Sequence, residues 1–275
     1  MTWQQIMLAG AVAAPWMAAV AIFALGERRE TERTAVGLIA GIVAAACALG
    51  VAGTAAEGDV AQVGWSLLGT RFALSADRLG ALFAVVAAVL WLVTTVYATG
   101  YMSHGRDRAR FFGFFSVCVG SAMGIALSAN LLTLFVFYEA LTLATYPLVV
   151  HSGSKAAVKG GRTYLIYALS GGTALALGVI WLYALGGGVE FGGGTIPGEL
   201  LAAHPTQLSI IFALLIAGFG VKAALFPAHG WLPAAMVAPA PVSALLHAVA
   251  VVKAGAFGIA RVVVDVYGQI GRAHV

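Results

Sequence analysis

The stretch "FALLIAGFGVKAALFPAHGWLPAAMVAPAPVSALLHAVAVVKAGAFGIARVVV", residues 212–264, is almost entirely apolar or small. It nevertheless contains two lysines, Lys222 and Lys253, and two histidines, His229 and His247. A charged side chain at the middle of a bilayer costs roughly 2.5–3.5 kcal/mol on insertion scales, so it needs a partner or a hydrated cavity. Basic groups placed in this way indicate a membrane segment in which the cationic side chains serve a functional site.

The whole chain shares this apolar character, with 61% hydrophobic residues, 9% charged residues and a mean hydropathy of +0.96. Soluble domains carry about 25% charged residues. The composition therefore predicts a polytopic membrane protein. The formal charge of +4 does not indicate nucleic-acid binding, because the basic residues lie mainly in short loops between apolar stretches and form no patch.

Eight stretches are close to the length of about 20 apolar residues that crosses a bilayer as a helix. They cover residues 3–25, 34–53, 79–101, 111–128, 131–150, 162–186, 207–226 and 241–264. No positive charge precedes the first one, which is longer than a signal-peptide core, so we expect a retained helix. The predicted fold is all-α: about eight transmembrane helices, the seventh broken, with an N-terminal three-helix region over residues 1–110.

Lysine and arginine are distributed unevenly between the connecting loops. The loops after the first, third and fifth stretches hold nine of these residues, whereas the loops after the second, fourth and sixth hold two, Arg71 and Arg78. The positive-inside rule then places the first group of loops in the cytoplasm. We expect a multi-pass protein of the cell's inner (plasma) membrane with its N-terminus outside.

A carboxylate lies near the middle of the fifth stretch, at Glu139 in "LLTLFVFYEALTLATYPLVV". Tyr138 and Thr142 lie beside it on a mixed polar and aromatic stripe, which is typical of a helix face that contacts protein. One interpretation is a structural carboxyl bonded to a neighbouring hydroxyl. The other is a carboxylate that tunes a buried base or exchanges protons with it.

Lys222 lies near the end of the seventh stretch, between two glycines and Pro227. Proline breaks or kinks a helix interior, and broken helices in membranes mark ion sites. Burial favours the neutral form of an amine and a nearby carboxylate favours its charged form, so a Glu139–Lys222 pair would be a switchable proton site. Snorkelling of Lys222 to the interface is the alternative.

Three further groups in the opening stretch could extend a proton path. His229 follows the break, His247 lies early in the eighth stretch with Ser243 four residues before it, and Lys253 follows six residues after His247. Six residues advance a helix by about 9 Å and turn it by about 240°, so contact between His247 and Lys253 would need water or another side chain. A structural role for each histidine remains open.

Asp77 begins the third stretch in "SADRLGALF". It is either a helix cap at the interface or part of an outer half-channel. We predict no metal site, since a divalent-metal carrier built on His229 and His247 would have few carboxylates and nearby lysines that repel the ion. The motifs GxxxxGK and CxxC are absent from the sequence.

Two segments resemble the antiporter-like, proton-conducting membrane subunits shared by respiratory NADH:quinone oxidoreductase and Mrp-type Na⁺/H⁺ antiporters. "FYEALTLATYPLV", residues 137–149, is similar to the glutamate motif of the family's fifth span. "VKAALFPAHGWLPAAMVAPAPVSALLHAVAVVKAG", residues 221–255, is similar to the broken seventh helix and the eighth helix. The resemblance extends to about residue 268 and is greatest to the D-type branch of the Mrp subunits.

The resemblance implies that Glu139 modulates Lys222, and that His247 and Lys253 link two half-channels. It implies that residues 111–268 form the first of two inverted five-helix repeats. It also implies a protein without a redox cofactor or catalytic chemistry of its own. Such a protein would work with other membrane subunits in the bilayer and translocate H⁺, with or without Na⁺.

The end of the chain departs from the family pattern, because the second repeat is missing. The last six residues, "IGRAHV" at 270–275, can be back-translated into a sequence that resembles a sequencing-library adapter. We therefore expect a C-terminally truncated chain with a non-native tail over residues 270–275.

Three interpretations of function follow. The first is a translocating subunit of a multisubunit cation/H⁺ antiporter, and the second is a proton-pumping subunit of a respiratory NADH:quinone oxidoreductase or hydrogenase complex. The third is a structural membrane scaffold whose polar groups have lost their role. The first two would use the same residues and differ in the source of energy.

Overall fold

The computed structural model describes residues 1–67, 70–103, 105–186, 188–191, 196–245 and 250–268. Seven of the described helices are long and apolar enough to cross a membrane. They are α1 (Trp3–Leu25), α2 (Glu30–Glu57), α3 (Arg78–Tyr101), α4 (Arg108–Ala126), α5 (Leu131–Val149), α6 (Lys155–Ala184) and α8 (Pro205–Lys222). The prediction of a helical, multi-span membrane fold is confirmed.

The remaining elements are short. They are α7 (Gly198–Ala203), α9 (Trp231–Ala235), α10 (Ala240–Ala244), α11 (Val251–Arg261), a π-helical turn (Val262–Val266) and the strands β1 (Gln62–Leu67) and β2 (Thr70–Ser75). The eighth predicted span, 241–264, covers most of α10, all of α11 and residues 246–249, which lie outside the described residues. The tail at 270–275 also lies outside them.

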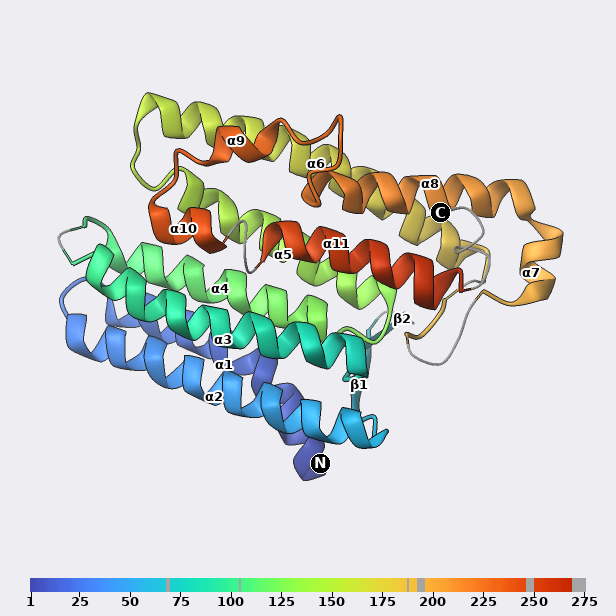
Figure 1. Ribbon diagram of the computed structural model, residues 1–275, viewed down its shortest axis with the longest axis horizontal. Helices are drawn as coiled ribbons and strands as arrows, with labels where there is room; N and C mark the ends of the chain where they lie inside the picture. Colours follow the sequence, from blue (N-terminus) through green and yellow to red (C-terminus); the bar gives the residue numbers. More distant parts are fainter. Residues whose placement is uncertain (68–69, 104, 187, 192–195, 246–249, 269–275) are drawn as a thin grey trace.

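The long helices lie side by side, with α4 at the centre of the bundle (Figure 1). Helix α4 is the most buried of the seven: 83% of its apolar 18-residue stretch is buried, against 33–50% of the corresponding stretch in each of the other six. Glycines allow this packing: at Gly120 and Gly124, a Cβ atom would lie 2.6 Å from the Trp16 ring and 2.3 Å from the Phe137 ring. The N-terminal helices α1, α2 and α3 therefore pack on one side of α4, and α5 packs on the other.

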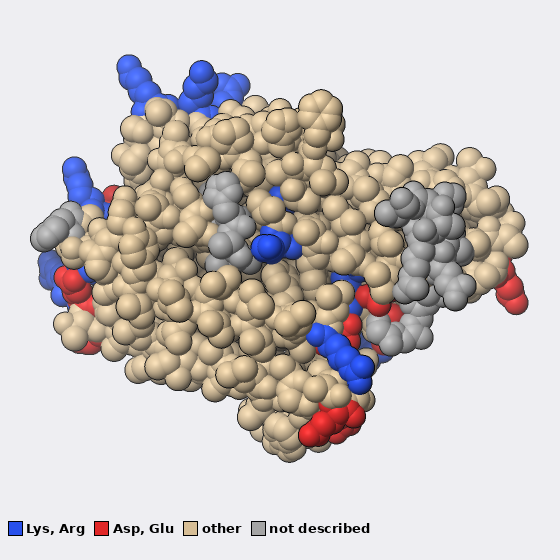
Figure 2. Space-filling view, in the orientation of Figure 1, with Lys and Arg blue, Asp and Glu red and all other residues tan. Residues whose placement is uncertain are grey.

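Charged side chains gather mainly at the two ends of the bundle, and the broad face between them carries few (Figure 2). One end carries the basic loops between α1 and α2, α3 and α4, and α5 and α6. The other end carries β1, β2 and α7 (Figure 1). We call these the basic end and the hairpin end.

The strands β1 and β2 form an antiparallel hairpin in a segment that was expected from the sequence to be a loop. The hairpin joins the bundle through backbone bonds from Ser75 N to Leu127 O and from Ala129 N to Ala73 O. The turn between α4 and α5 thus supplies partners for β2. Those partners lie more than 50 residues further along the chain, so local alternation does not show them.

The seventh predicted span ends early, because α8 stops at Lys222 and α9 starts at Trp231. At the break, Ala224 adopts a φ of +56°, a conformation that non-glycine residues rarely take. The carbonyls freed there find partners: Gly220 accepts from Leu225 N, and Val221 accepts from Trp231 Nε1 at 2.7 Å. A satisfied backbone of this kind is what irregular chain at membrane depth requires.

Candidate functional site

Lys222 is the last residue of α8 and is buried, with 1% of its surface exposed. Its Nζ donates a hydrogen bond to the backbone oxygen of Tyr138 on α5 and lies 3.3 Å from the centroid of the Tyr138 ring. The amine therefore has a carbonyl and an aromatic face as partners. A carbonyl and a ring both favour a cation at this position.

Tyr138 supports this contact through both its hydroxyl and its backbone carbonyl. Its hydroxyl donates to Gly218 O at 3.1 Å, which ties α5 to α8 one turn before Lys222. Its carbonyl also accepts from Thr142 Oγ1 at 3.2 Å. Tyr138 and Thr142, both predicted as neighbours of the site, are fully buried there.

Glu139 follows Tyr138 on α5 but faces a different helix. A Cβ atom on Gly172 of α6 would lie 2.5 Å from Glu139 Oε1. That oxygen is buried and has no hydrogen-bond partner, and no ion pair joins Glu139 to Lys222 among the described residues. The predicted pair therefore makes no direct contact: Lys222 lies on Tyr138, and Glu139 lies against α6.

Small residues allow α6 and α8 to approach each other beside this site. A Cβ atom on Gly171 would lie 2.8 Å from Val221, and one on Gly218 would lie 2.8 Å from Gly171 O. The glycines of both helices thus place the end of α8 next to Glu139 and Tyr138. The glycines of α8 were noted from the sequence, whereas those of α6 were not.

The other predicted residues lie apart from this centre. His229 is exposed, and its ring stacks on Phe226 with centroids 5.7 Å apart. Ser243 is half-buried, and its hydroxyl donates to Ala238 O. His247 lies outside the described residues.

Lys253 lies on the exposed face of α11. It lines a cavity of about 270 Å³ whose other walls are apolar side chains of α3 and α11, among them Leu82 and Phe83. The opposite face of α11 packs on α8, where a Cβ atom on Gly258 would overlap the Phe219 ring. The structure thus separates Lys253 from Lys222 by the width of α11.

A second group of buried charges, not anticipated from the sequence, lies at the hairpin end. Arg261 on α11 is 1% exposed and donates to both carboxylate oxygens of Asp77, the N-cap of α3, and to Asp265 Oδ2 at 2.8 Å. We call Asp77, Arg261 and Asp265 the ion triplet. An arginine and an aspartate four residues apart in an apolar stretch were the signal that could have revealed it.

Asp77 also caps α3, because its Oδ1 accepts from Gly80 N at 2.9 Å. Burial acts to raise the pKa of the Asp77 carboxyl, but the hydrogen bonds and charge of Arg261 outweigh it and lower that pKa below its usual value. The cap interpretation is therefore visible in the structure. The same side chain also links α3 to α11.

Within the described residues, no group of three or more histidine, cysteine or acidic side chains is placed to hold a metal ion.

The fold and this site define a class: a multi-span membrane protein with ionisable groups buried between helices, one of them at a helix break. Residues 128–274 match the family model described as "NADH:quinone oxidoreductase/Mrp antiporter, TM", and residues 65–112 match "NADH-Ubiquinone oxidoreductase (complex I), chain 5 N-terminus". The chain belongs to the NADH:quinone oxidoreductase/Mrp antiporter membrane-subunit family, as the sequence resemblance had predicted.

Curated relatives come from both branches of that family. The chain is 34% identical over 237 residues to a probable K⁺/H⁺ antiporter subunit of the A/B type from Rhizobium meliloti, covering 84% of the chain and 24% of the relative. It is 36% identical over 190 residues to the chloroplastic NAD(P)H-quinone oxidoreductase subunit 5 of Mesostigma viride, covering 67% of the chain and 29% of the relative. The chain thus spans about a quarter of the length of these relatives, and the assignment to the D-type Mrp branch stays a prediction.

Solved structures agree on the fold. The Mrp complex from Dietzia sp. DQ12-45-1b aligns with a TM-score of 0.77 and 26% identity, covering 92% of this chain and 28% of that one. A membrane-bound sulfane sulfur reductase, an archaeal respiratory membrane complex, aligns with a TM-score of 0.81 at 21% identity, covering 98% of this chain and 55% of that one. The second likeness supports the fold alone.

Proposed function

We propose that the chain forms part of a proton-translocating membrane subunit of a multisubunit cation/H⁺ antiporter. The observation that carries this proposal is the buried Lys222 amine on the Tyr138 carbonyl and ring, at the end of a broken helix and near the half-buried Glu139. A protonated Lys222 satisfies both of its partners. A neutral Lys222 loses the attraction of the ring and is ready to accept a proton again.

Glu139 would control this exchange through its charge. A carboxylate next to the site favours the charged amine, and neutralisation of Glu139 by a proton or an approaching cation favours release. Because the two groups make no direct contact, transfer between them would need water or a shift of α8. The Oε1 atom of Glu139, which is buried without a partner, is where such a donor would bind.

The remaining predicted residues would extend the path in both directions. Lys253 would lead along α11, with His247, which lies outside the described residues, as its predicted relay partner. His229 and Ser243 would lie towards the α9–α10 side, and the ion triplet would lie at the outer half-channel predicted for Asp77. Partners would be other membrane subunits, and transported ions would be H⁺ with or without Na⁺. We further propose a plasma-membrane location with the N-terminus outside.

The same residues could serve a redox-driven respiratory complex. The antiporter function is favoured because the antiporter relative matches 84% of the chain, whereas the quinone oxidoreductase relative matches 67%. Neighbouring genes would distinguish the two. Genes for iron–sulfur subunits would support the respiratory complex, and genes for small antiporter subunits would support the antiporter.

The test is proton-coupled transport by the full-length protein, assembled in its complex and reconstituted in vesicles. Lys222→Ala and Glu139→Gln should each reduce transport by roughly 10²-fold or more, the usual contribution of a positioned proton-transfer group. Lys155→Ala and Glu199→Gln remove exposed charges of the same kinds and should leave transport unchanged. Wild-type transport by Lys222→Ala in an assembled complex would sink the proposal and favour the scaffold interpretation.

A further inference from the structure

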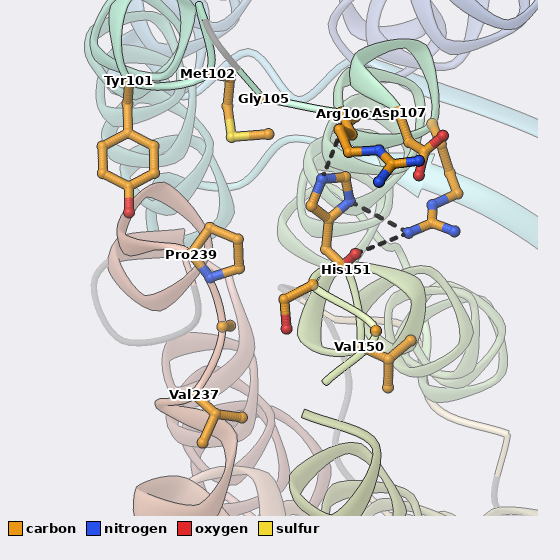
Figure 3. A pocket seen from close by; sticks show the side chains of 13 residues that line it. Tyr101, Met102, Gly105, Arg106, Asp107, Val150, His151, Val237 and Pro239 are labelled. Carbon is orange, nitrogen blue, oxygen red and sulfur yellow. Dashed lines mark hydrogen bonds between the residues drawn. The ribbon is translucent and has the colours of Figure 1, made fainter. Parts of the chain in front are cut away.

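A cavity of about 640 Å³ lies at the basic end of the bundle, away from Lys222 (Figure 3). Three connections meet around it: the α3–α4 loop, the α5–α6 loop and the link between α9 and α10. Neither the site described above nor the family match assigns it a role. Its two walls differ in chemistry.

One wall is cationic and is built by Arg106, Arg110 and His151. Neither arginine forms an ion pair with a carboxylate among the described residues. Other arginines of the same end are neutralised, since Arg33 pairs with Glu27 and Arg108 with Glu30. The charges of the two guanidinium groups at the cavity can therefore act on an anion.

His151 fixes this wall in place. Its Nε2 lies 3.2 Å from Arg106 O, so Nε2 carries the proton and donates to that carbonyl. Arg110 Nη2 donates to His151 O at 3.1 Å and lies 3.5 Å from Nδ1. The ring packs edge-on against Phe111. His151 therefore contacts both Arg106 and Arg110 from one position (Figure 3).

The charge of the wall selects the class of anion. Burial and the charge of Arg110 lower the pKa of His151, so the imidazole is neutral near pH 7. Two arginines and the Asp107 carboxylate then leave a net charge of +1 at the cavity. This charge matches a headgroup whose only charge is one phosphodiester. A phosphate monoester carries about −1.5 to −2, and a zwitterionic headgroup adds a cation that the arginines repel.

The N-terminus of α4 is not available for the anion. Glu27 already accepts from the backbone nitrogens of Arg108, at 3.1 Å, and Ala109, at 2.7 Å. Binding would therefore depend on the arginine side chains, whose planar donors suit phosphate oxygens. This dependence makes the site testable by substitution.

The opposite wall is apolar. Tyr101 and Met102 at the end of α3 face Val237 and Pro239 of the link between α9 and α10, and Val150 lies below the arginines (Figure 3). A free anion in water gains nothing from such a wall. A lipid gains from it, because its acyl chain can lie along these side chains while its headgroup contacts the arginines.

We propose that this cavity binds the phosphodiester headgroup of an anionic phospholipid of the inner leaflet, with the acyl chain against the apolar wall. The site would hold the three connections together at the membrane surface. Its position at the basic end agrees with the cytoplasmic side given by the positive-inside rule.

The experiment compares lipid retained by the chain in nanodiscs, measured by native mass spectrometry, with phosphatidylglycerol or phosphatidylcholine as the test lipid. Wild type should retain phosphatidylglycerol preferentially, and Arg106→Gln with Arg110→Gln should reduce its apparent affinity about tenfold or more. Arg162→Gln with Lys159→Gln removes the same charge from the same end outside the cavity and should keep wild-type retention.

Several outcomes would overturn the proposal. The first is unchanged phosphatidylglycerol retention in the Arg106/Arg110 variant, and the second is an equal loss of retention in the control variant. The third concerns thermal stability: inorganic phosphate, added to the protein in phosphatidylcholine at matched ionic strength, would raise the unfolding temperature as much as phosphatidylglycerol does. If the double variant does not fold, the Ser152→Trp variant tests whether the cavity binds the lipid. It fills the cavity from an exposed position, keeps both arginines, and must lose phosphatidylglycerol if the cavity is the site.

Discussion

At the scale of single residues, the arrangement of Tyr138 and Glu139 explains how one helix serves two neighbours. Successive residues of an α-helix project about 100° apart. Tyr138 therefore reaches Lys222 and Gly218 on α8, while Glu139 packs at Gly172 on α6. In the proposed function, a carboxyl near the amine but not in contact with it would change the electrostatic potential at Lys222 without blocking its proton.

Gly172→Ala tests whether the position of the carboxyl matters. The added methyl group would lie 2.5 Å from Glu139 Oε1 and force that side chain to move. We expect transport to fall several-fold while the complex still assembles. Gly53→Ala on α2, where nothing lies within 4 Å, is the matched control and should transport normally. Wild-type transport by Gly172→Ala would mean that Glu139 tolerates displacement.

At the scale of elements, α11 is held between two other helices. Its glycine face packs on α8, where a Cβ atom on Gly255 would lie 2.3 Å from Ala223 N. Its C-terminal end is tied to the start of α3 through Arg261 and Asp77. The Phe219 ring continues the contact inward, because it lies edge-on to Tyr138 with centroids 5.2 Å apart. A movement of α11 would therefore displace Phe219 and Tyr138, and with them the partners of Lys222.

Asp77→Asn should weaken the tie between α3 and α11. We expect a loss of about 1.5–3 kcal/mol of stability, the range for a hydrogen bond to a charged group, with Asp265 still bound to Arg261. Thermal unfolding in detergent measures this loss. Glu190→Gln breaks the exposed pair between Arg71 and Glu190 at the same end, and should cost about 0–1 kcal/mol. Equal losses in the two variants would contradict a special role for the ion triplet.

The ion triplet also predicts a dependence on pH. Because the pKa of Asp77 is lower in the folded protein, its contribution to stability is complete above about pH 4, the usual value for aspartate, and is lost as pH falls through the folded value. Asp265 and Arg261 are the charged groups that face it. Wild type should therefore destabilise more steeply below pH 4 than Asp77→Asn. Parallel curves for the two proteins would argue against the lowered pKa.

At the scale of the whole molecule, charge is separated from apolar surface, and this separation is the basis of the proposed membrane orientation. The basic loops lie at one end, and the hairpin and α7 lie at the other (Figures 1 and 2). Between them, exposed Val and Leu side chains of α2, α3 and α6 cover the face that lipid or neighbouring subunits would contact. An exposed cation, Lys253, interrupts this apolar band.

Cysteine labelling in intact cells tests the orientation. Glu199→Cys at the hairpin end should react with a membrane-impermeant maleimide added outside, because α7 would face outward. Arg28→Cys at the basic end should react only after permeabilisation. Both positions are exposed, so access through protein does not limit either reaction. The reverse pattern would invert the proposed topology.

The sequence alone determined the class of fold and the order of its spans, because hydropathy over about 20 residues is a local property. It also located the helix break near Lys222 through nearby glycines and Pro227, which act on their own stretch of backbone. The family resemblance pointed to Glu139 and Lys222 for the same reason: their motifs are contiguous in the chain. Their roles stay predictions.

Only the tertiary structure decided which groups meet. It placed Lys222 on Tyr138 instead of on Glu139, supplied backbone partners for the β1–β2 hairpin, and joined Asp77 to Arg261 across 184 positions of sequence. Each of these contacts depends on how closely helices approach, and that approach is set by glycines on facing helices such as Gly171 and Gly218. Local patterns can indicate that a buried charge such as Arg261 needs a partner, but they do not identify a distant partner such as Asp77, since packing between distant segments selects it.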